Sequence, residues 1–181
     1  EIITSKCSYD RDKDIALQLK LLNEKKIKKI KVKNISSLGK NFSPTKEQIE
    51  AVTVALNNNI SVITGGPGTG KTTVLSLIAN QLKHNKIKFA LTALTGKASR
   101  RISEIKGLEK TDTSTIHLLL VKAEANIKPS PIDQTLIIDE ASMLDIALMQ
   151  KLVRSLDKNS KLIFVGDVDQ LPPISPGQVF K

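Results

Sequence analysis

A glycine-rich segment that follows a short apolar run carries the residue types and spacing most suited to chemistry. The segment GGPGTGKTT, residues 65–73, comes directly after ISVIT and fits the template G-x-x-x-x-G-K-[ST]. Its glycines let consecutive backbone N–H groups surround phosphate oxygens, Lys71 can reach the β- and γ-phosphates, and the Thr72 hydroxyl can ligate Mg²⁺. The pattern predicts a loop that binds a nucleoside triphosphate rather than an ordinary turn. The expected contact residues are Gly66, Pro67, Gly68, Thr69, Gly70, Lys71, Thr72 and Thr73.

A pair of acids ends a second apolar run. The segment LIIDEAS places Asp139 and Glu140 after three apolar residues, 68 residues beyond Lys71. In a chain that also has a phosphate-binding loop, such a pair is typical of a Walker B site. We expect Asp139 to hold Mg²⁺ and Glu140 to orient or deprotonate the attacking water, so ATP and Mg²⁺ are the expected cofactors.

Three further polar segments each allow two interpretations. Gln170, in KLIFVGDVDQLPP, can contact a γ-phosphate or lie exposed in a proline-terminated loop, and spacing alone favours the loop. The segments LTALTGKASRR, residues 91–101, and TSTIH, residues 113–117, place hydroxyls where they can hold a phosphodiester or cap a helix. Without further context, helix caps and a partly buried His117 are the simpler interpretation.

An alternation of short apolar strands and helical periods predicts the scaffold for these motifs. Strands are expected at residues 60–64, 88–94, 135–139 and 161–166, and helices at 70–84, about 96–106, about 115–126 and 142–156. This order predicts an α/β fold in which helices cover both faces of a mostly parallel sheet. The motifs would then lie at the carboxyl edge of the sheet, where ligands bind in open α/β sheets.

The N-terminal part is less regular. Residues 10–33 have partly helical spacing and residues 34–41 look like a linker. A helix should begin at Ser43-Pro44, with serine as the N-cap, and end at 57–59. Its inward residues are expected to be Ile49, Val52, Val54 and Leu56.

Charge and composition narrow the classes of function. The net charge is +10, and residues 1–46 hold 12 Lys and Arg against 5 Asp and Glu, which favours a polyanionic partner and a solvated basic helix about equally. One cysteine and two histidines exclude a disulfide framework and a Cys- or His-based metal cluster. With no apolar stretch of membrane length and no secretory signal, we expect no membrane partner and a cytoplasmic location. The first residue, Glu1, suggests a piece of a longer protein.

Five motifs in this order resemble one family. The segments GGPGTGKTT, ALTALTGKASRR, TSTIH, LIIDEASMLD and FVGDVDQLPPISPG are similar to the N-terminal motor domain of superfamily 1 helicases, a RecA-like P-loop NTPase domain. The resemblance is closest to the RecD-like branch, which includes the exodeoxyribonuclease V alpha subunit and RecD/TraA-type helicases. It divides the chain into a basic helical segment with a linker at 1–41 and an ATPase domain at 42–181.

The resemblance also implies roles for individual residues. Gln48, in PTKEQIEAV, would read the adenine edge as the Q motif does. Gln170 would couple the nucleotide state to DNA binding, and translocation would run 5′ to 3′. The residues implied to lie along the single-stranded DNA track are Thr95, Lys97 and His117. Single-stranded DNA is therefore the expected partner, together with subunits of a nuclease complex.

Family members use a second RecA-like domain whose arginines stabilise the transition state, and such an arginine is worth about 10³–10⁵ in rate. We therefore expect this chain alone to bind ATP, hydrolyse it poorly and not unwind DNA. An RNA helicase or conjugative helicase of the same superfamily, and a nucleotide-dependent binding or scaffold module, remain open. A small-molecule kinase is disfavoured, and a Rossmann dinucleotide site is excluded because Lys71 stands where its last glycine belongs.

Overall fold

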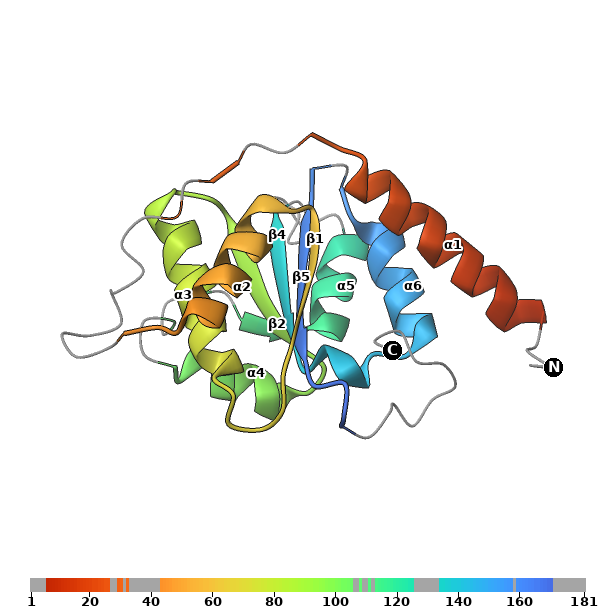
Figure 1. The fold of residues 1–181 in the computed structure, drawn as a ribbon. Helices are drawn as coiled ribbons and strands as arrows, with labels where there is room; N and C mark the ends of the chain where they lie inside the picture. Colours follow the sequence, from red (N-terminus) through yellow and green to blue (C-terminus); the bar gives the residue numbers. More distant parts are fainter. Residues whose placement is uncertain are drawn as a thin grey trace.

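The computed structural model has a parallel five-stranded sheet at its centre, with helices on both faces (Figure 1). It describes residues 6–26, 29–30, 32, 43–105, 108, 111, 113–125, 134–157 and 159–170, and the elements given below are those of these residues. The strands are β1 (Ile60–Thr64), β2 (Phe89–Ala93), β3 (Thr113–Thr115), β4 (Thr135–Asp139) and β5 (Lys161–Gly166). Their order across the sheet is β1-β5-β4-β2-β3. The predicted α/β fold of RecA-like P-loop type is confirmed.

Two layers of helices cover the sheet. The helices are α1 (Lys6–Asn23), α2 (Lys46–Asn57), α3 (Lys71–His84), α4 (Gly96–Ser103), α5 (Ile116–Glu124) and α6 (Ile146–Ser155), with a short 3₁₀ turn at Ala141–Met143. Helices α2, α3 and α4 lie on one side of the sheet, and α1, α5 and α6 lie on the other (Figure 1). Each strand connection therefore crosses over through a helix, as parallel pairing requires.

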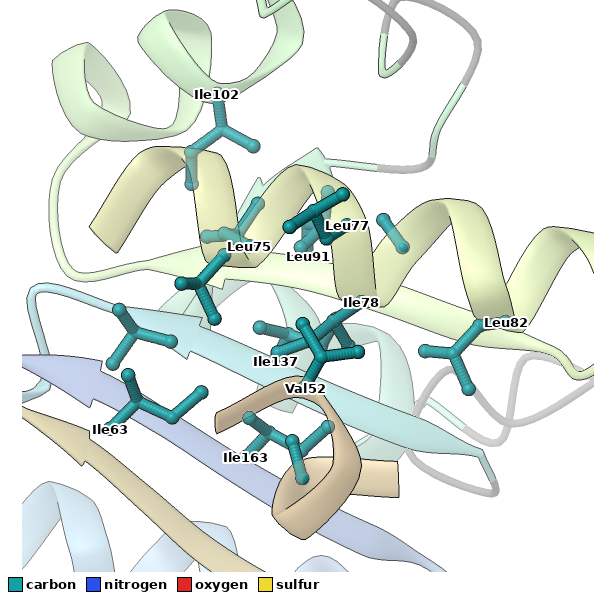
Figure 2. Close-up of a cluster of buried hydrophobic side chains, with 14 of the residues drawn as sticks. Val52, Ile63, Leu75, Leu77, Ile78, Leu82, Leu91, Ile102, Ile137 and Ile163 are labelled. Atoms are coloured by element: carbon teal, nitrogen blue, oxygen red, sulfur yellow. The ribbon is translucent and has the colours of Figure 1, made fainter. Parts of the chain in front are cut away.

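Alternating side chains of the strands build two separate cores. Ile137 and Ile163 point into the cluster under α2 and α3, whereas Leu136 and Ile138 point into the cluster under α5 and α6. Figure 2 shows the first cluster, where Ile78 of α3 lies over the sheet. These side chains are almost wholly buried, and each contributes on the order of 1.5–3 kcal/mol by leaving water. The two cores hold the strand ends in fixed register.

Helix α2 begins later than expected, so the prediction of a start at Ser43-Pro44 is wrong. Thr45 is the N-cap: its hydroxyl accepts a hydrogen bond from the Gln48 backbone N–H at 3.3 Å. The Gln48 side-chain oxygen accepts the Thr45 N–H at 3.1 Å in return. This reciprocal capping box satisfies two helix-end donors at once, which a serine cap two residues earlier could not do.

The expected inward face of α2 is also wrong in part. Val52 and Leu56 are buried as expected, but Ile49 is 38% exposed and Val54 is 44% exposed. Residues two apart lie about 200° apart around a helix, so Val52 and Val54 cannot share one face. The buried stripe takes Ala55 in place of Val54, at the spacing i, i+3, i+4.

In the second half of the chain, one strand was not predicted and two helix boundaries differ from the predicted ones. Strand β3 was not expected, because three residues are too short to show a period, and it pairs only with Leu91–Ala93 of β2. Helix α4 ends at Ser103 rather than near 106. Helix α6 begins at Ile146 rather than at 142, because Asp145 caps it by accepting the Leu148 N–H at 2.7 Å.

The N-terminal helix α1 packs on α6 (Figure 1). Its Ile15 and Leu22 are buried in the same core as α6. Beside them, the Asp14 carboxylate accepts hydrogen bonds from Gln150 Nε2 at 2.7 Å and from Arg154 Nε at 2.5 Å. The division of the chain at 41/42 stays a prediction, since both residues lie outside the described ones. No helix among the described residues is long and apolar enough to cross a membrane.

Candidate nucleotide and metal site

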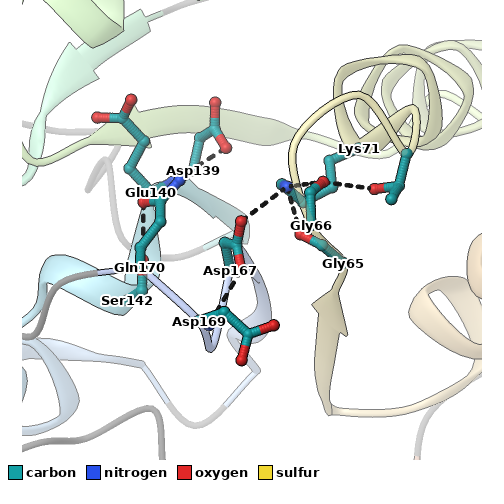
Figure 3. Close-up of polar contacts among 10 residues, drawn as sticks. Gly65, Gly66, Lys71, Asp139, Glu140, Ser142, Asp167, Asp169 and Gln170 are labelled. Atoms are coloured by element: carbon teal, nitrogen blue, oxygen red, sulfur yellow. Dashed lines mark hydrogen bonds and ion pairs between the residues drawn. The ribbon is translucent and has the colours of Figure 1, made fainter.

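Three motif-bearing strand ends lie next to one another at the carboxyl edge of the sheet. Strand β5 lies between β1 and β4, and its last residue Gly166 is opposite Thr64, the last residue of β1. The phosphate-binding loop therefore begins on one side of the end of β5, and Asp139 ends β4 on the other (Figure 3). Residues far apart in the sequence meet here because the strand order brings them together.

The loop between β1 and α3 has the backbone of an anion-binding turn. Gly68 and Gly70 have φ angles of +74° and +87°, a conformation in which a side chain is strained. Thr69 closes the turn, since its hydroxyl donates to the Gly66 carbonyl at 2.9 Å. No side chain caps the N-terminus of α3, so its first N–H groups and its positive dipole end are left for an anion.

Gln48 lies against this loop, although it comes from α2. An added Cβ at Gly70 would lie 2.5 Å from the Gln48 side-chain nitrogen, so the amide sits directly beside the glycine. The capping box fixes the same side chain through its oxygen. Gln48 is thus held at the edge of the candidate nucleotide site, and its role toward adenine stays a prediction.

Lys71 is surrounded by oxygen atoms. Its ammonium donates to the carbonyls of Gly65 and Gly66, the latter at 2.8 Å, and lies 3.7 Å from the Asp167 carboxylate (Figure 3). Asp167 is only 2% exposed. The sequence reasoning assigned no role to this acid, although it directly follows strand β5. The signal available in the sequence was an acid directly after the last predicted strand, residues 161–166.

Two opposing effects act on the pKa of the Asp139 carboxyl group. Burial raises its pKa, whereas the hydrogen bond from the Glu140 N–H, at 2.9 Å, and the charges of Arg101 and Lys71 favour the ionised form. A partly desolvated carboxylate of this kind gains from a bound cation. Among the described residues, no group of three His, Cys, Asp or Glu side chains could hold a metal alone. Mg²⁺ usually binds through one or two protein carboxylates together with substrate phosphates.

Glu140 has a backbone conformation that is rare for its residue type. Its φ angle is +55°, in the left-handed region, and it stands between the end of β4 and the 3₁₀ turn. Such strain costs on the order of 1–3 kcal/mol and is concentrated at functional sites. The backbone leaves the regular strand at this residue, immediately after the candidate metal ligand.

Gln170 is exposed, as the simpler interpretation predicted, but it also makes two hydrogen bonds. Its N–H donates to the Asp167 carbonyl at 3.3 Å, and its side-chain oxygen accepts from the Ser142 hydroxyl at 3.5 Å. It therefore joins the turn after β5 to the turn after Asp139. The following residues, 171–181, lie outside the described part of the chain.

The residues assigned to nucleic acid lie at two separate places. Thr95 caps α4 by accepting the Ala98 N–H at 3.2 Å, so the expected helix cap is present. Lys97 lines a pocket of about 680 Å³ on α4. His117 is exposed rather than partly buried and lines another pocket, of about 270 Å³, between α5 and α6. The structure therefore does not bring Lys97 and His117 into one pocket.

Comparison with known proteins assigns the family. Residues 48–176 match the family model described as an AAA domain. The chain belongs to this AAA domain family. The match extends from Gln48, across the glycine-rich loop, to beyond Gln170, so it includes every element of the candidate site.

Several relatives of this AAA domain are named as RecD proteins. It is 40% identical over 188 residues to the RecBCD enzyme subunit RecD of Buchnera aphidicola, which covers 89% of this chain and 31% of that protein. It is 36% identical over 138 residues to the ATP-dependent RecD2 DNA helicase of Deinococcus radiodurans, covering 74% and 19%. The RecBCD enzyme subunit RecD of Mycobacterium tuberculosis is 35% identical over 158 residues, covering 74% and 28%.

These similarities confirm the resemblance to RecD-like motor domains of superfamily 1 helicases. The chain spans less than a third of the length of each of these three relatives. The residues of this chain that match the family model include the phosphate-binding loop.

Proposed function

We propose that this RecD-like motor domain binds and hydrolyses ATP with Mg²⁺ to drive 5′-to-3′ movement along single-stranded DNA in recombination and repair. The observation that carries the proposal is the meeting of three strand ends, which brings Lys71, Asp139 and the Asp167–Gln170 turn to one edge. The names of the relatives, RecBCD enzyme subunit RecD and RecD2 DNA helicase, support the same assignment.

The loop residues would hold the triphosphate. The Lys71 ammonium already contacts oxygen atoms of three residues, and the β- and γ-phosphates would take their place. Thr72 and Asp139 would hold the metal, and the half-buried position of the Asp139 carboxylate at the end of β4 supports this role. Bound Mg²⁺ would supply charge neutralisation on the phosphate oxygens.

Glu140 and Gln170 would serve the hydrolytic step. Glu140 would orient and deprotonate the attacking water, because its side chain is a carboxylate that directly follows Asp139 at the end of β4. Gln170 would report the nucleotide state, since its bond to Ser142 already links it to the segment that follows Glu140. Gln48 would contact the adenine edge from the side of Gly70.

Nucleic acid would bind along the continuation of the same edge. Thr95 and Lys97, at the start of α4, and His117, at the start of α5, would contact the strand. Subunits of a nuclease complex are proposed as further partners, because two of the three relatives named above are RecBCD subunits by name. The cytoplasmic location stays a prediction.

The first test measures nucleotide binding and the chemical step separately. Binding of a fluorescent ATP analogue is followed in the 181-residue chain, and phosphate release is followed with protein in excess over ATP, which detects slow hydrolysis. Lys71→Ala should abolish both signals, whereas Glu140→Gln should keep binding and lose hydrolysis. Glu50→Gln, an exposed acid on α2, is the control and should change neither.

Three outcomes would change the proposal. If the wild type binds ATP and Glu140→Gln does not alter phosphate release, the chain acts as a nucleotide switch rather than a motor. If RNA oligonucleotides bind better than DNA of the same sequence, the RNA helicase alternative is favoured. If Lys71→Ala binds the analogue as well as the wild type, the site is wrongly placed.

A further inference from the structure

Asp167 places a buried carboxylate beside the ammonium group that would receive the triphosphate. Its side chain is only 2% exposed, and its Oδ2 atom lies 3.7 Å from the Nζ atom of Lys71 (Figure 3). The Lys71 side chain is 20% exposed. Because one member of this ion pair is removed from water, the two charges attract each other more strongly than those of a fully exposed pair.

The two carboxylate oxygens of Asp167 make different contacts. The Oδ2 atom faces Lys71, whereas the Oδ1 atom accepts a hydrogen bond from the Asp169 N–H at 3.0 Å. Asp167 therefore shapes the turn after β5 and also supplies a counter-ion to the loop after β1. The contact with Lys71 depends on a negative charge. The contact with Asp169 needs only an acceptor oxygen, which an asparagine side chain also has.

A triphosphate in the loop would compete with this carboxylate for the same ammonium group. Lys71 has three N–H donors, and it already donates to the carbonyls of Gly65 and Gly66. Its ion pair with Asp167 is the further contact that the described residues give it. A phosphate oxygen that approaches Lys71 also meets repulsion from the Asp167 carboxylate, since both are anions. Phosphate binding must therefore break an ion pair that the nucleotide-free loop already contains.

We propose that Asp167 is a positioning residue that holds the Lys71 ammonium group in the nucleotide-free protein and thereby lowers the affinity of the loop for phosphate anions. The proposal rests on the proposed function, since it assumes that Lys71 receives the β- and γ-phosphates. In the nucleotide-free protein, the buried carboxylate has a cation beside it and the lysine side chain stays at the loop. The triphosphate then takes over Lys71 from Asp167.

The expected size of the effect lies between those of exposed and buried ion pairs. An exposed pair changes an equilibrium constant by up to about fivefold, and breaking a buried pair changes it by more than about a hundredfold. Lys71 is partly exposed and keeps its contacts with two carbonyls. We therefore expect the charge of Asp167 to lower the affinity for a triphosphate by about five- to thirtyfold.

The first measurement tests the ion pair in the nucleotide-free 181-residue chain. Urea unfolding compares the wild type with Lys71→Met, Asp167→Asn and the variant that carries both substitutions. Lys71→Met leaves the buried carboxylate without its cation, so it should be destabilising. Asp167→Asn should then be more favourable in Lys71→Met than in the wild type, by at least about fivefold in the unfolding equilibrium constant.

The second measurement is the affinity for a fluorescent ATP analogue without Mg²⁺, so that no added cation neutralises the phosphates. Asp167→Asn should bind the analogue about five- to thirtyfold more tightly than the wild type. Asp167→Ala should show the same gain, which excludes a new hydrogen bond from the asparagine amide as its cause. Asp169→Asn is the matched control, because it removes an exposed acid from the same turn, and it should change the affinity less than about twofold.

The inference is overturned if the two substitutions show no coupling in stability, if Asp167→Asn binds the analogue no more tightly than the wild type, or if Asp169→Asn gains as much. If the wild type binds the analogue and only these differences are missing, the proposed function stands and the inference falls. If neither the wild type nor Asp167→Asn binds the analogue, the loop does not hold a triphosphate and the proposed function falls as well. Thermal unfolding verifies that each variant is folded.

Discussion

Replacing Gly70 with alanine should destabilise the protein more than the same change at Gly66 or Gly68 of the same loop. Gly70 has a φ of +87°, and an added Cβ would lie 2.5 Å from the Gln48 side-chain nitrogen. Gly68 has a φ of +74° but nothing within 4 Å of the added atom. Gly66 has neither a positive φ nor a neighbour within 4 Å. The three positions separate backbone strain from side-chain collision.

The expected magnitudes follow from these geometries. A residue with a Cβ in the left-handed region costs roughly 1–2 kcal/mol, so Gly68→Ala should lose about that much. Gly70→Ala adds the displacement of Gln48 from the capping box of α2, and loss of a helix cap typically costs about 1 kcal/mol. We therefore expect about 2–3 kcal/mol for Gly70→Ala, and less than about 0.5 kcal/mol for Gly66→Ala.

Urea unfolding of the nucleotide-free chain measures the three free energies, with the slope checked for constancy. Adding Gln48→Ala to Gly70→Ala should reduce the cost of the glycine substitution to about that of Gly68→Ala, since the side chain in the way is gone. Equal costs at Gly66 and Gly70 would refute the reasoning from φ. A cost at Gly70 that Gln48→Ala leaves unchanged would refute the proposed collision.

Three further predictions concern charged groups. Asp139→Asn should raise the free energy of unfolding near pH 7, because burial raises the pKa of this carboxyl and the fold disfavours its ionised form; denaturation at pH 7 measures the gain. Burial lowers the pKa of Lys161 to about 8, so the folded state binds fewer protons than the unfolded state above that pH. Stability should therefore rise between about pH 8 and 10.5, by at most about 3 kcal/mol, and Lys161→Met should remove this slope. Hydrogen bonds from Gln150 and Arg154 lower the pKa of Asp14, so Asp14→Ala should speed amide exchange in α1 at pH 7, and the difference from the wild type should vanish as acid protonates Asp14.

Much of the sheet could be predicted because its central strands are continuous apolar runs. The predicted bounds of β1, β4 and β5 are the observed ones. Strands β4 and β5 are buried apolar runs in the middle of the sheet, and β1 follows shortly after the end of α2. Strand β3 could not be predicted, because its three residues become a strand only by pairing with β2. The start of α6 needed the recognition that Asp145 is a cap, a signal that the sequence does contain.

The candidate site shows the same division between local and distant information. The glycine-rich loop is one continuous segment and Asp139 and Glu140 are adjacent residues, so each motif can be predicted from local sequence alone. Asp167 pairs with Lys71 across 96 positions of the chain, and Arg101 acts on Asp139 only because β2 lies beside β4. Such contacts depend on the strand order, which composition and periodicity do not determine.

The strand order also restricts how the proposed nucleic-acid sites could influence the nucleotide. Across the sheet, the loop after β1 comes first, then the Asp167 turn after β5, then Asp139 at the end of β4, and only then α4 after β2. Asp139 therefore stands between Lys71 and Arg101, and the charge of each favours its ionised form. A ligand bound at α4 that acts on the triphosphate through the sheet edge must change the field at Asp139 or the Ser142–Gln170 contact beside it. Removing Arg101 tests the first route and Gln170→Ala tests the second, so the two substitutions together should separate an electrostatic coupling from a hydrogen-bonded one.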